Sequence, residues 1–302
     1  MSATRPVILL FGAGGQVGWE LRRTLSPLGQ VETAGRGRVR HPVDLADPTG
    51  LEALVKQVRP SLMVNAAAYT AVDQAESEPE PARRVNAEAV GLMGRLGAEL
   101  GCPVLHYSTD YVFSGDGVRP WREEDPTEPL SVYGRTKREG EQLLAASGAD
   151  HLVLRLAWVY GARGRNFLRT MQRLMNEREE IGVVADQVGA PTWARQIAEA
   201  TAQVLAQCRT VEGGFCFGGR GGIYHLTAAG AASWHEFACA IRDGLGLACE
   251  VHPIPTADYP TPAARPAMSV LDNSRLWREF GVALPHWREG LALCLEELRE
   301  AS

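Results

Sequence analysis

The apolar and polar positions in the first half of the chain alternate between short strands and longer helices. Residues 7–11 form a continuous apolar run that ends in glycine, and the following segment places Leu21 and Leu25 four residues apart on one helical face. The alternation then repeats as far as residue 157. It predicts strands at 30–34, 61–67, 103–108 and 151–157, and helices at 48–57, 80–100 and 133–146.

Strands that alternate with helices imply right-handed crossovers and a mostly parallel sheet with helices on both faces. We therefore predict an α/β fold with a Rossmann-like doubly wound sheet, which forms a dinucleotide-binding domain over residues 1–160. After Trp158 the pattern loosens, and residues 161–302 are expected to form mainly a smaller substrate-binding lobe, from which some segments can return to the sheet. The elements expected there are helices at 167–178, 194–206, 234–245 and 287–299 and an irregular loop with five prolines at 253–266.

Composition and charge narrow the possible classes of protein. Apolar residues make up 45% and charged residues 22% of the chain, which is typical of a packed globular protein. The net charge of -5 argues against a nucleic acid partner, because binding a polyanion needs clustered Lys and Arg. Apolar runs are too short for a signal peptide or a membrane span, so we expect neither export nor a membrane partner but a cytoplasmic protein.

The cysteine pattern favours free thiols over a metal site. The chain has six cysteines with no CxxC pair and no histidine at zinc-ligand spacing, so we predict buried thiols in a reducing compartment and no metal. They are Cys102, Cys208, Cys216, Cys239, Cys249 and Cys294.

A glycine-rich turn follows the first predicted strand and opens the first helix. Glycines at three-residue spacing can supply a tight turn, a close backbone approach to a pyrophosphate, and close packing of the helix on the sheet. Glycine triplets also occur in purely structural turns, but the strand-turn-helix context favours dinucleotide binding. The residues predicted to contact the cofactor here are Gly12, Gly15, Gln16, Val17 and Gly18.

The end of the second strand carries arginines where many dinucleotide sites have a carboxylate. That carboxylate binds the ribose 2′-hydroxyl, whereas Arg36 and Arg38 suit a 2′-phosphate, so we expect NADPH, with NADH possible. A solvated basic loop is the alternative. Asp44 and Leu45 are predicted to lie beside the adenine.

Small residues follow the strand at 61–67. Ala67, Ala68 and Tyr69 are predicted to let the flat cofactor lie against the backbone in the crevice at the strand ends, although small residues here also suit tight helix packing.

Tyr133 and Lys137 are predicted to lie four residues apart on one helix, with Thr109 at the end of a neighbouring strand. An adjacent ammonium would lower the pKa of the phenol, which makes Tyr133 a candidate proton donor and Lys137 the residue that tunes it. Thr109 could donate a hydrogen bond to the same substrate oxygen. A Tyr-x-x-x-Lys pair alone is common on solvated helices, and the glycine turn and the Asn-Ala-Ala segment strengthen this prediction.

Several motifs carry a resemblance to a known family. STDYVF, DQVGAPT and YPTPAARP, together with FGAGGQVGWEL and VYGRTKREGE, make the chain similar to the extended short-chain dehydrogenase/reductase superfamily and, within it, to the dTDP-4-dehydrorhamnose reductase family. The resemblance covers nearly the whole chain. It implies that NADPH reduces the 4-keto group of dTDP-4-dehydro-L-rhamnose to give dTDP-L-rhamnose, with Tyr133 protonating the emerging alkoxide and Lys137 also holding the nicotinamide ribose. The residues it places at the nucleotide-sugar substrate are Thr109, Asp110, Trp158, Asn166 and Arg265.

Two other readings remain open at this point. One is another nucleotide-sugar epimerase, reductase or dehydratase of the same superfamily, although the Asp-Glu pair typical of dehydratases is absent after Thr109. The other is a non-catalytic NADP-binding subunit resembling the regulatory partner of methionine adenosyltransferase. The resemblance leaves a monomer or a homodimer open. Asp73 and Glu76 are interpreted as capping or solvated residues rather than catalytic ones.

Overall fold

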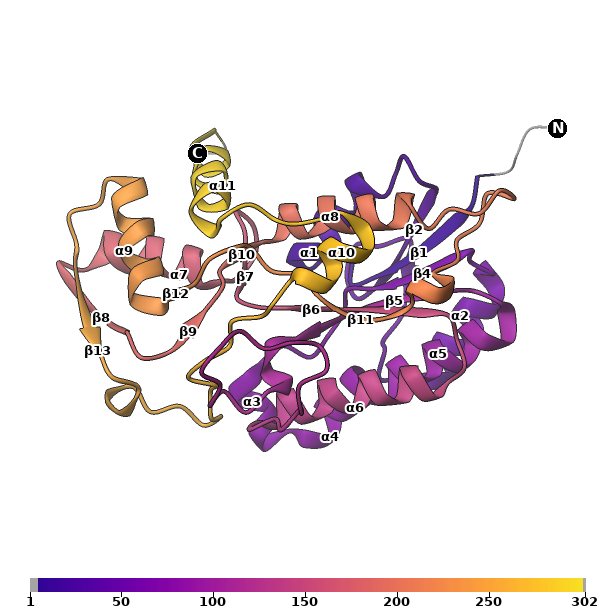
Figure 1. The fold of residues 1–302 in the computed structure, drawn as a ribbon, viewed down its shortest axis with the longest axis horizontal. Helices are drawn as coiled ribbons and strands as arrows, with labels where there is room; N and C mark the ends of the chain where they lie inside the picture. The colour runs from indigo at the N-terminus through magenta and orange to yellow at the C-terminus, as the bar shows by residue number, and fades with distance from the viewer. Residues whose placement is uncertain (1–4, 301–302) are drawn as a thin grey trace.

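Seven parallel strands form the main sheet of the protein, whose computed structural model describes residues 5–300. The strand order is β11-β6-β5-β4-β1-β2-β3, so the chain moves outward from β1 to β3 and then resumes at β4 on the other side of β1 (Figure 1). This reversal confirms the predicted doubly wound fold. The strands are β1 Val7–Phe11, β2 Gln30–Gly35, β3 His41–Pro42, β4 Leu62–Asn65, β5 Val104–Thr109, β6 His151–Leu156 and β11 Gly222–His225.

Helices cover both faces of this sheet, as the buried strands require. Helices α1 (Gln16–Thr24) and α8 (Ala194–Ala206) pack on one face, and α2 (Pro48–Val58), α5 (Ala89–Leu100) and α6 (Val132–Ala146) cover the other (Figure 1). Strand side chains point alternately into two apolar layers, because Ile8 and Leu10 belong to the first and Leu9 and Phe11 to the second.

The helix predicted at 80–100 is not continuous. It consists of α4 (Pro79–Arg83), a π-helical turn (Arg84–Glu88) and α5. At this turn Asn86 donates from Nδ2 to Thr136 Oγ1 (3.1 Å), and a Cβ added to Gly140 would lie 2.2 Å from Asn86 O. The turn therefore brings α6, which carries the predicted catalytic residues, close against its neighbour.

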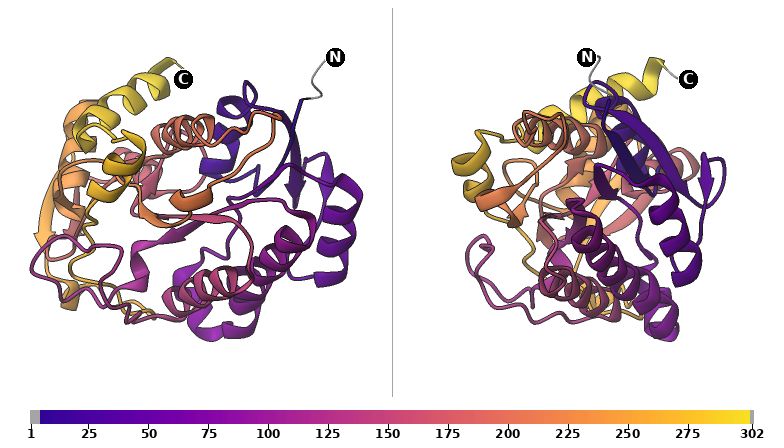
Figure 2. Two further views of the ribbon diagram at one scale, coloured as in Figure 1. Left: turned by 45° about the vertical axis from the view of Figure 1, so that its right-hand side comes forward. Right: turned by 90° about the vertical axis from the view of Figure 1, so that its right-hand side faces the viewer.

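The later part of the chain forms a second, smaller body at the opposite end of the molecule (Figure 2). Helices α7 (Phe167–Glu177), α9 (Trp234–Leu245) and α11 (Trp287–Glu300) share an apolar core with the parallel pair β8 (Glu180–Val184) and β13 (Glu250–Ile254). This pair was not predicted, and β13 includes Pro253 from the stretch expected to be an irregular loop. Proline is tolerated there because each strand of a two-stranded sheet has a free edge.

Several segments of the second half return to the first body. Helix α8 covers the main sheet, β11 pairs with β6, and α10 (Ser274–Phe280) packs on the same core. The remaining short elements are α3 Val72–Ser77, β7 Val159–Tyr160, β9 Val188–Gly189, β10 Thr192–Trp193, β12 Ala232–Ser233 and three 3₁₀ turns at Asp110–Val112, Gly218–Arg220 and Thr256–Asp258.

Cysteine burial differs in part from the expectation. All six cysteines are free; Cys102, Cys208, Cys249 and Cys294 are buried, whereas Cys239 is half-buried and Cys216 is exposed. Among residues 5–300, no helix has the length and apolar character needed to cross a bilayer.

An ion pair is buried between α6 and β6, behind the strand ends. Arg155 donates from Nε and Nη2 to the two carboxylate oxygens of Glu141 (2.9 and 2.8 Å), and the two side chains are 1% and 0% exposed. Phe113 lies under the guanidinium, 5.0 Å from ring centroid to Cζ. Such a pair is strongly destabilised when one partner alone is removed, because the other charge is left buried without a counterion.

We expect Glu141→Gln to lower the free energy of unfolding by about 3 kcal/mol, because the Arg155 charge is left uncompensated. Urea denaturation followed by circular dichroism measures this difference. The control is Glu177→Gln, which breaks the exposed pair between Glu177 and Arg173 (2.7 Å) and should cost less than about 1 kcal/mol. Equal losses in the two variants would contradict the prediction.

Candidate active site

The glycine turn after β1 touches the segment after β4. Gly12 has a φ of +77°, and a Cβ at this position would lie 2.5 Å from Ala67 N; a Cβ on Gly18 would lie 2.1 Å from Gly12 O. Only glycine fits either position without displacing the backbone. Because β1 and β4 flank the point where the strand order reverses, this contact forms the floor of the crevice in which such sheets bind ligands.

The other residues predicted at the cofactor lie around this turn. Gly15 caps the N-terminus of α1, Val17 packs its side chain on the core, and Gln16 is half-buried. Ala67 and Ala68 are half-buried at the crevice. Their contacts with a dinucleotide stay predictions.

Tyr69 is held on both its backbone and its side chain. Its N–H donates to Asn86 Oδ1 (2.8 Å) and its hydroxyl to Glu78 Oε2 (2.7 Å). Burial and the neighbouring Glu78 carboxylate raise the pKa of Tyr69 to about 12.

A hollow of about 460 Å³ opens at the ends of β2 and β3, where we predicted the 2′-phosphate site. Arg36 and Asp44 line it, Arg38 is exposed nearby, and Leu45 is buried in the core beneath. Leu45 is therefore a packing residue in this structure. The full lining is Gly35, Arg36, Gly37, Pro42, Val43, Asp44, Asp47 and Gly50.

The three arginines near this hollow differ in their partners. Arg40 forms an ion pair with the buried carboxylate of Glu32 (2.9 Å), which also contacts His41 (2.8 Å). The prediction of a phosphate site therefore rests on Arg36 and Arg38.

Thr109, Asp110 and Tyr133 converge at the end of β5. The Thr109 hydroxyl donates to Asp110 Oδ1 (2.9 Å), and the Tyr133 ring packs edge-on against the ring of Tyr111, with centroids 5.6 Å apart. Burial raises the pKa of Tyr133 to about 12, an effect partly offset by the Thr109 hydroxyl and reinforced by the Asp110 charge. Burial also raises the pKa of Asp110 to about 7.

Lys137 is buried and faces β5. Its amine donates to the carbonyl oxygen of Tyr107 (2.6 Å) and lies 3.1 Å from Nε2 of His106. Burial lowers the pKa of Lys137 to about 7, against a raising effect of Glu141. The expected lowering of the Tyr133 pKa by an adjacent ammonium is therefore not seen, because burial dominates both groups and the amine is bonded to the strand.

Trp158 lies where the two bodies meet. Its φ is +47°, in the left-handed region, and its ring stacks on Trp234 with centroids 3.4 Å apart and planes 2° apart. A Cβ added to Gly189 would lie 2.4 Å from the Trp158 ring. The half-buried indole is thus held between Trp234 of α9 and Gly189 of β9.

Asn166 and Arg265, predicted at the substrate, already have protein partners. Asn166 caps α7 by accepting from Arg169 N (3.1 Å) and donates from Nδ2 to Gln16 Oε1 (2.8 Å). Arg265 binds both carboxylate oxygens of Asp73 (3.0 and 2.8 Å). Both side chains thus link the second half of the chain to the first, and their substrate contacts stay predictions.

The interpretation of Asp73 and Glu76 as non-catalytic agrees with their contacts. Asp73 pairs with Arg265, which holds the pKa of the carboxyl below its usual range. Glu76 accepts a hydrogen bond from Val132 N (2.7 Å) at the first residue of α6. Glu76 therefore caps the helix that carries Tyr133.

Sequence reasoning missed several residues around the site. His106 and Asn65 contact the Lys137 region from the strands, and Trp234 supports Trp158 from α9. A polar residue within a continuous apolar strand, such as His106 in VLHYST, is the signal that could have identified the first of these.

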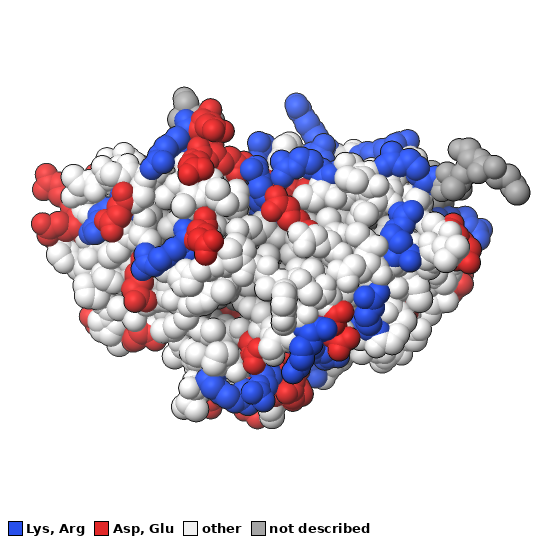
Figure 3. Space-filling model, turned by 45° about the horizontal axis from the view of Figure 1, so that its top comes forward, with Lys and Arg blue, Asp and Glu red and all other residues white. Residues whose placement is uncertain are grey.

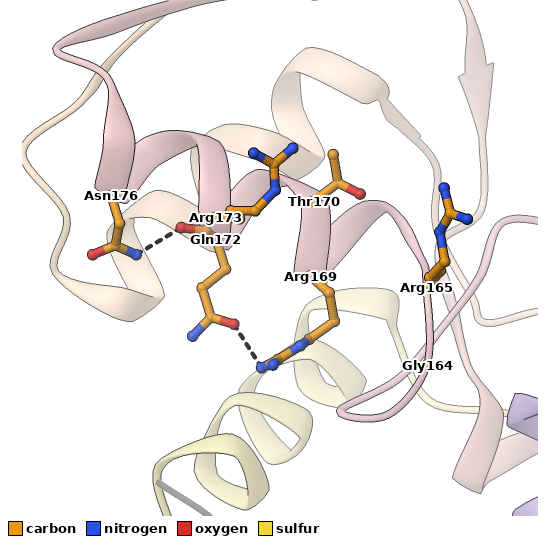
Figure 4. Close-up of a pocket in the computed structure, with 7 residues that line it drawn as sticks. All are labelled: Gly164, Arg165, Arg169, Thr170, Gln172, Arg173 and Asn176. Atoms are coloured by element: carbon orange, nitrogen blue, oxygen red, sulfur yellow. Dashed lines mark hydrogen bonds between the residues drawn. The ribbon is translucent and has the colours of Figure 1, made fainter.

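Two surface features lie elsewhere. A hollow of about 610 Å³ lies along α7, where Arg169 donates to Gln172 Oε1 (2.7 Å) and Asn176 to Gln172 O (2.6 Å) (Figure 4). Within residues 5–300, Glu180, Glu250 and His252 offer ligand atoms within 4.8 Å of one another, but all three are exposed. On the face shown in Figure 3, basic and acidic side chains are interspersed.

The fold is Rossmann-like, and the reductases described below, to which the chain is similar, place it among the oxidoreductases. Residues 6–300 match the family described as RmlD substrate binding domain, and the chain belongs to this family. The family resemblance expected from the sequence is thereby confirmed.

Relatives of known name cover almost the whole chain. A dTDP-4-dehydrorhamnose reductase from Burkholderia thailandensis is 49% identical over 299 residues, which cover 96% of this chain and 98% of the relative. The solved structure of such a reductase from Clostridium acetobutylicum has a TM-score of 0.88 at 32% identity, covering 97% of this chain and 99% of that chain. A reductase from Bacillus anthracis in complex with NADP has a TM-score of 0.86 at 30% identity, covering 99% of this chain and 100% of that chain.

We expect Asp110→Asn to stabilise the protein at pH 8 by an amount on the order of a few kcal/mol, and much less at pH 4. The carboxyl has a pKa of about 7 when folded but about 3.9 when unfolded, so wild-type stability falls as the pH rises through this window. Urea midpoints at several pH values measure the effect.

The control is Asp125→Asn, which should behave in the opposite way. Arg119 lowers the pKa of Asp125 to about 2, so its carboxylate stabilises the fold above the unfolded pKa and loses this contribution in acid. A stability gain in Asp110→Asn that does not change with pH would show that burial of the charge is not its cause.

Proposed function

We propose that the protein reduces the 4-keto group of dTDP-4-dehydro-L-rhamnose to a hydroxyl, with NADPH as the reductant and dTDP-L-rhamnose as the product. The observation that carries this proposal is the grouping of Thr109 and Asp110, bonded to each other at the end of β5 (2.9 Å), with the buried phenol of Tyr133, in a chain of the reductase family. The full-length relatives named dTDP-4-dehydrorhamnose reductase support the choice of substrate.

The structure fits a nicotinamide dinucleotide on physical grounds. The close approach of Gly12 to Ala67 leaves bare backbone at the crevice floor, and the N-terminus of α1 follows directly, where backbone N–H groups favour a pyrophosphate. Arg36 lines the hollow at the end of β2, where a ribose 2′-phosphate would be paired. NADPH, when bound, supplies the hydride.

The proton comes from Tyr133 of α6, whose phenol lies near the end of β5. Tyr133 is the general acid: its neutral phenol donates to the oxygen that becomes negative as the keto carbon is reduced. Because the pKa of the phenol is raised to about 12, Tyr133 is fully protonated near neutral pH, as a proton donor must be. The Thr109 hydroxyl, 2.9 Å from Asp110 Oδ1, helps to orient this oxygen.

The residues assigned to the nucleotide-sugar substrate lie in the second half of the chain. Trp158 offers an aromatic surface stacked on Trp234, and Arg265 carries the charge that suits a diphosphate. Since Arg265 is paired with Asp73, substrate binding at this residue requires the phosphate to share or replace that carboxylate. The six free thiols suit a reducing compartment, and we place the reaction in the cytoplasm.

The test is oxidation of NADPH, followed by its absorbance, in the presence of dTDP-4-dehydro-L-rhamnose. Turnover with this substrate, and slower turnover with a UDP-linked 4-keto sugar, is the expected result. Cofactor binding without oxidation would favour a non-catalytic NADP-binding subunit, and interconversion of sugars without net NADPH consumption would favour an epimerase.

Tyr133→Phe should lower kcat by about 100-fold or more while NADPH still binds, because the phenylalanine ring keeps the shape but has no proton to donate. Single-turnover absorbance and fluorescence titration with NADPH measure the two quantities. Near-normal turnover would remove Tyr133 from its role. Tyr224→Phe, which removes a buried hydroxyl bonded to the Arg220 carbonyl away from the site, is the matched control and should retain most of the activity.

Replacing Arg36 and Arg38 together by alanine should raise the KM for NADPH by about 10-fold or more and leave the KM for NADH nearly unchanged, because only NADPH carries the 2′-phosphate. Initial rates with each cofactor measure this. Arg95→Ala, on the exposed side of α5, is the control. A similar rise for both cofactors would refute phosphate recognition by these arginines.

A further inference from the structure

Three buried side chains form a continuous hydrogen-bonded line from the backbone of Ala67 at the crevice floor to Lys137. Ala67 N lies 3.1 Å from Asn65 Oδ1, Asn65 Nδ2 lies 3.1 Å from His106 Nδ1, and His106 Nε2 lies 3.1 Å from Lys137 Nζ. Asn65 and His106 are 0% exposed and Lys137 is 1% exposed. The line crosses from β4 through β5 to α6.

The direction of each hydrogen bond in this line is fixed at the Ala67 end. A backbone N–H can only donate, so Asn65 Oδ1 accepts from Ala67 and Nδ2, which can only donate, faces His106. His106 Nδ1 must then accept, which leaves the hydrogen of the neutral imidazole on Nε2. That hydrogen points at Lys137 Nζ.

An N–H that points at a lysine nitrogen has a partner only if that nitrogen carries a lone pair. An ammonium has three donors and no acceptor, so two donors would face each other across 3.1 Å inside the protein. An uncharged amine accepts from His106 and still donates to the carbonyl oxygen of Tyr107 (2.6 Å). The uncharged amine is the form that satisfies every group in the line.

We propose that His106 is a positioning residue that donates a hydrogen bond to Lys137 and holds its amine in the uncharged form beside the catalytic tyrosine. The meaning of this arrangement for catalysis rests on the proposed function. The remaining hydrogen of the amine is free to bond within the site, so Lys137 acts there first as a hydrogen-bond donor without a full charge.

Titratable groups on α6 and β5 influence the protonation state of the Lys137 amine. Glu141, one turn further along α6, favours the ammonium, but its carboxylate is already engaged by Arg155 and Arg138. From β5, His106 faces the amine, and burial by itself lowers the pKa of His106, which keeps the ring neutral. Burial of Lys137 acts in the same direction as the His106 bond.

The sequence makes this protonation state directly measurable. Lys56 and Lys137 are the two lysines of the chain, and Lys56 is a half-exposed residue of α2 paired with Glu52 (2.6 Å). Lysine labelled with ¹³C at Cε therefore gives two NMR signals, and Lys56→Arg leaves the Lys137 signal alone. The titration runs from about pH 5 to pH 11 on the full protein without substrate.

We expect the Lys137 signal of the Lys56→Arg protein to titrate near neutral pH. Adding His106→Asn, whose shorter amide can occupy the place of Nδ1 but does not reach Lys137, should raise the midpoint by about one pH unit or more, because the neutral amine loses its donor. The control is Tyr107→Phe, which alters the next residue of β5 but keeps its carbonyl group and should leave the midpoint unchanged.

Two results would overturn the proposal. One is a titration midpoint of Lys137 close to that of an exposed lysine. This result would be seen in the Lys56→Arg protein with His106 intact, so it does not depend on the folding of a His106 variant. The other is an unchanged midpoint in a folded His106→Asn protein. The titration involves no substrate or cofactor, so its outcome is independent of whether the sugar-nucleotide assay succeeds, and failure of that assay would leave the protonation state of Lys137 intact.

Discussion

The contact between the backbone of Gly12 and that of Ala67 is the constraint on which the rest of the site depends. It joins the ends of β1 and β4 at the point where the strand order reverses, and a side chain at Gly12 would separate them. Because Ala67 N is held there, Asn65 has a fixed orientation, and this orientation passes through His106 to Lys137. The predicted cofactor crevice and Lys137 are thus parts of one hydrogen-bonded framework.

Much of the first half of the fold could be predicted from the sequence, because buried parallel strands are short apolar runs and their helices have a clear amphipathic period. The pairing of β8 with β13 was not predicted, because the two strands lie about 70 residues apart in the chain and β13 contains Pro253. The break before α5 was also missed. It arises from the close packing of Gly140 on Asn86, a tertiary contact that no local pattern records.

The site shows the same division between local and long-range information. The spacing of Tyr133 and Lys137 and the place of Thr109 predict that the three meet near one strand end, where Thr109 is one of the groups that act on the pKa of Tyr133. The electrostatics could not be predicted, because burial outweighs the expected effect of a neighbouring charge. Arg265 and Asn166 are assigned to the substrate by the family resemblance, which stays a prediction, and the sequence does not reveal that Asp73 and Gln16 already engage them.

The bond between Asn166 and Gln16 ties the smaller body to the turn that would hold the pyrophosphate. The same amide caps α7, so an outward swing of that helix must either drag the turn along or break the bond first. The positions of α7 and of the predicted pyrophosphate turn are therefore coupled through one side chain, so a change in the packing of α7 acts on the turn without touching it.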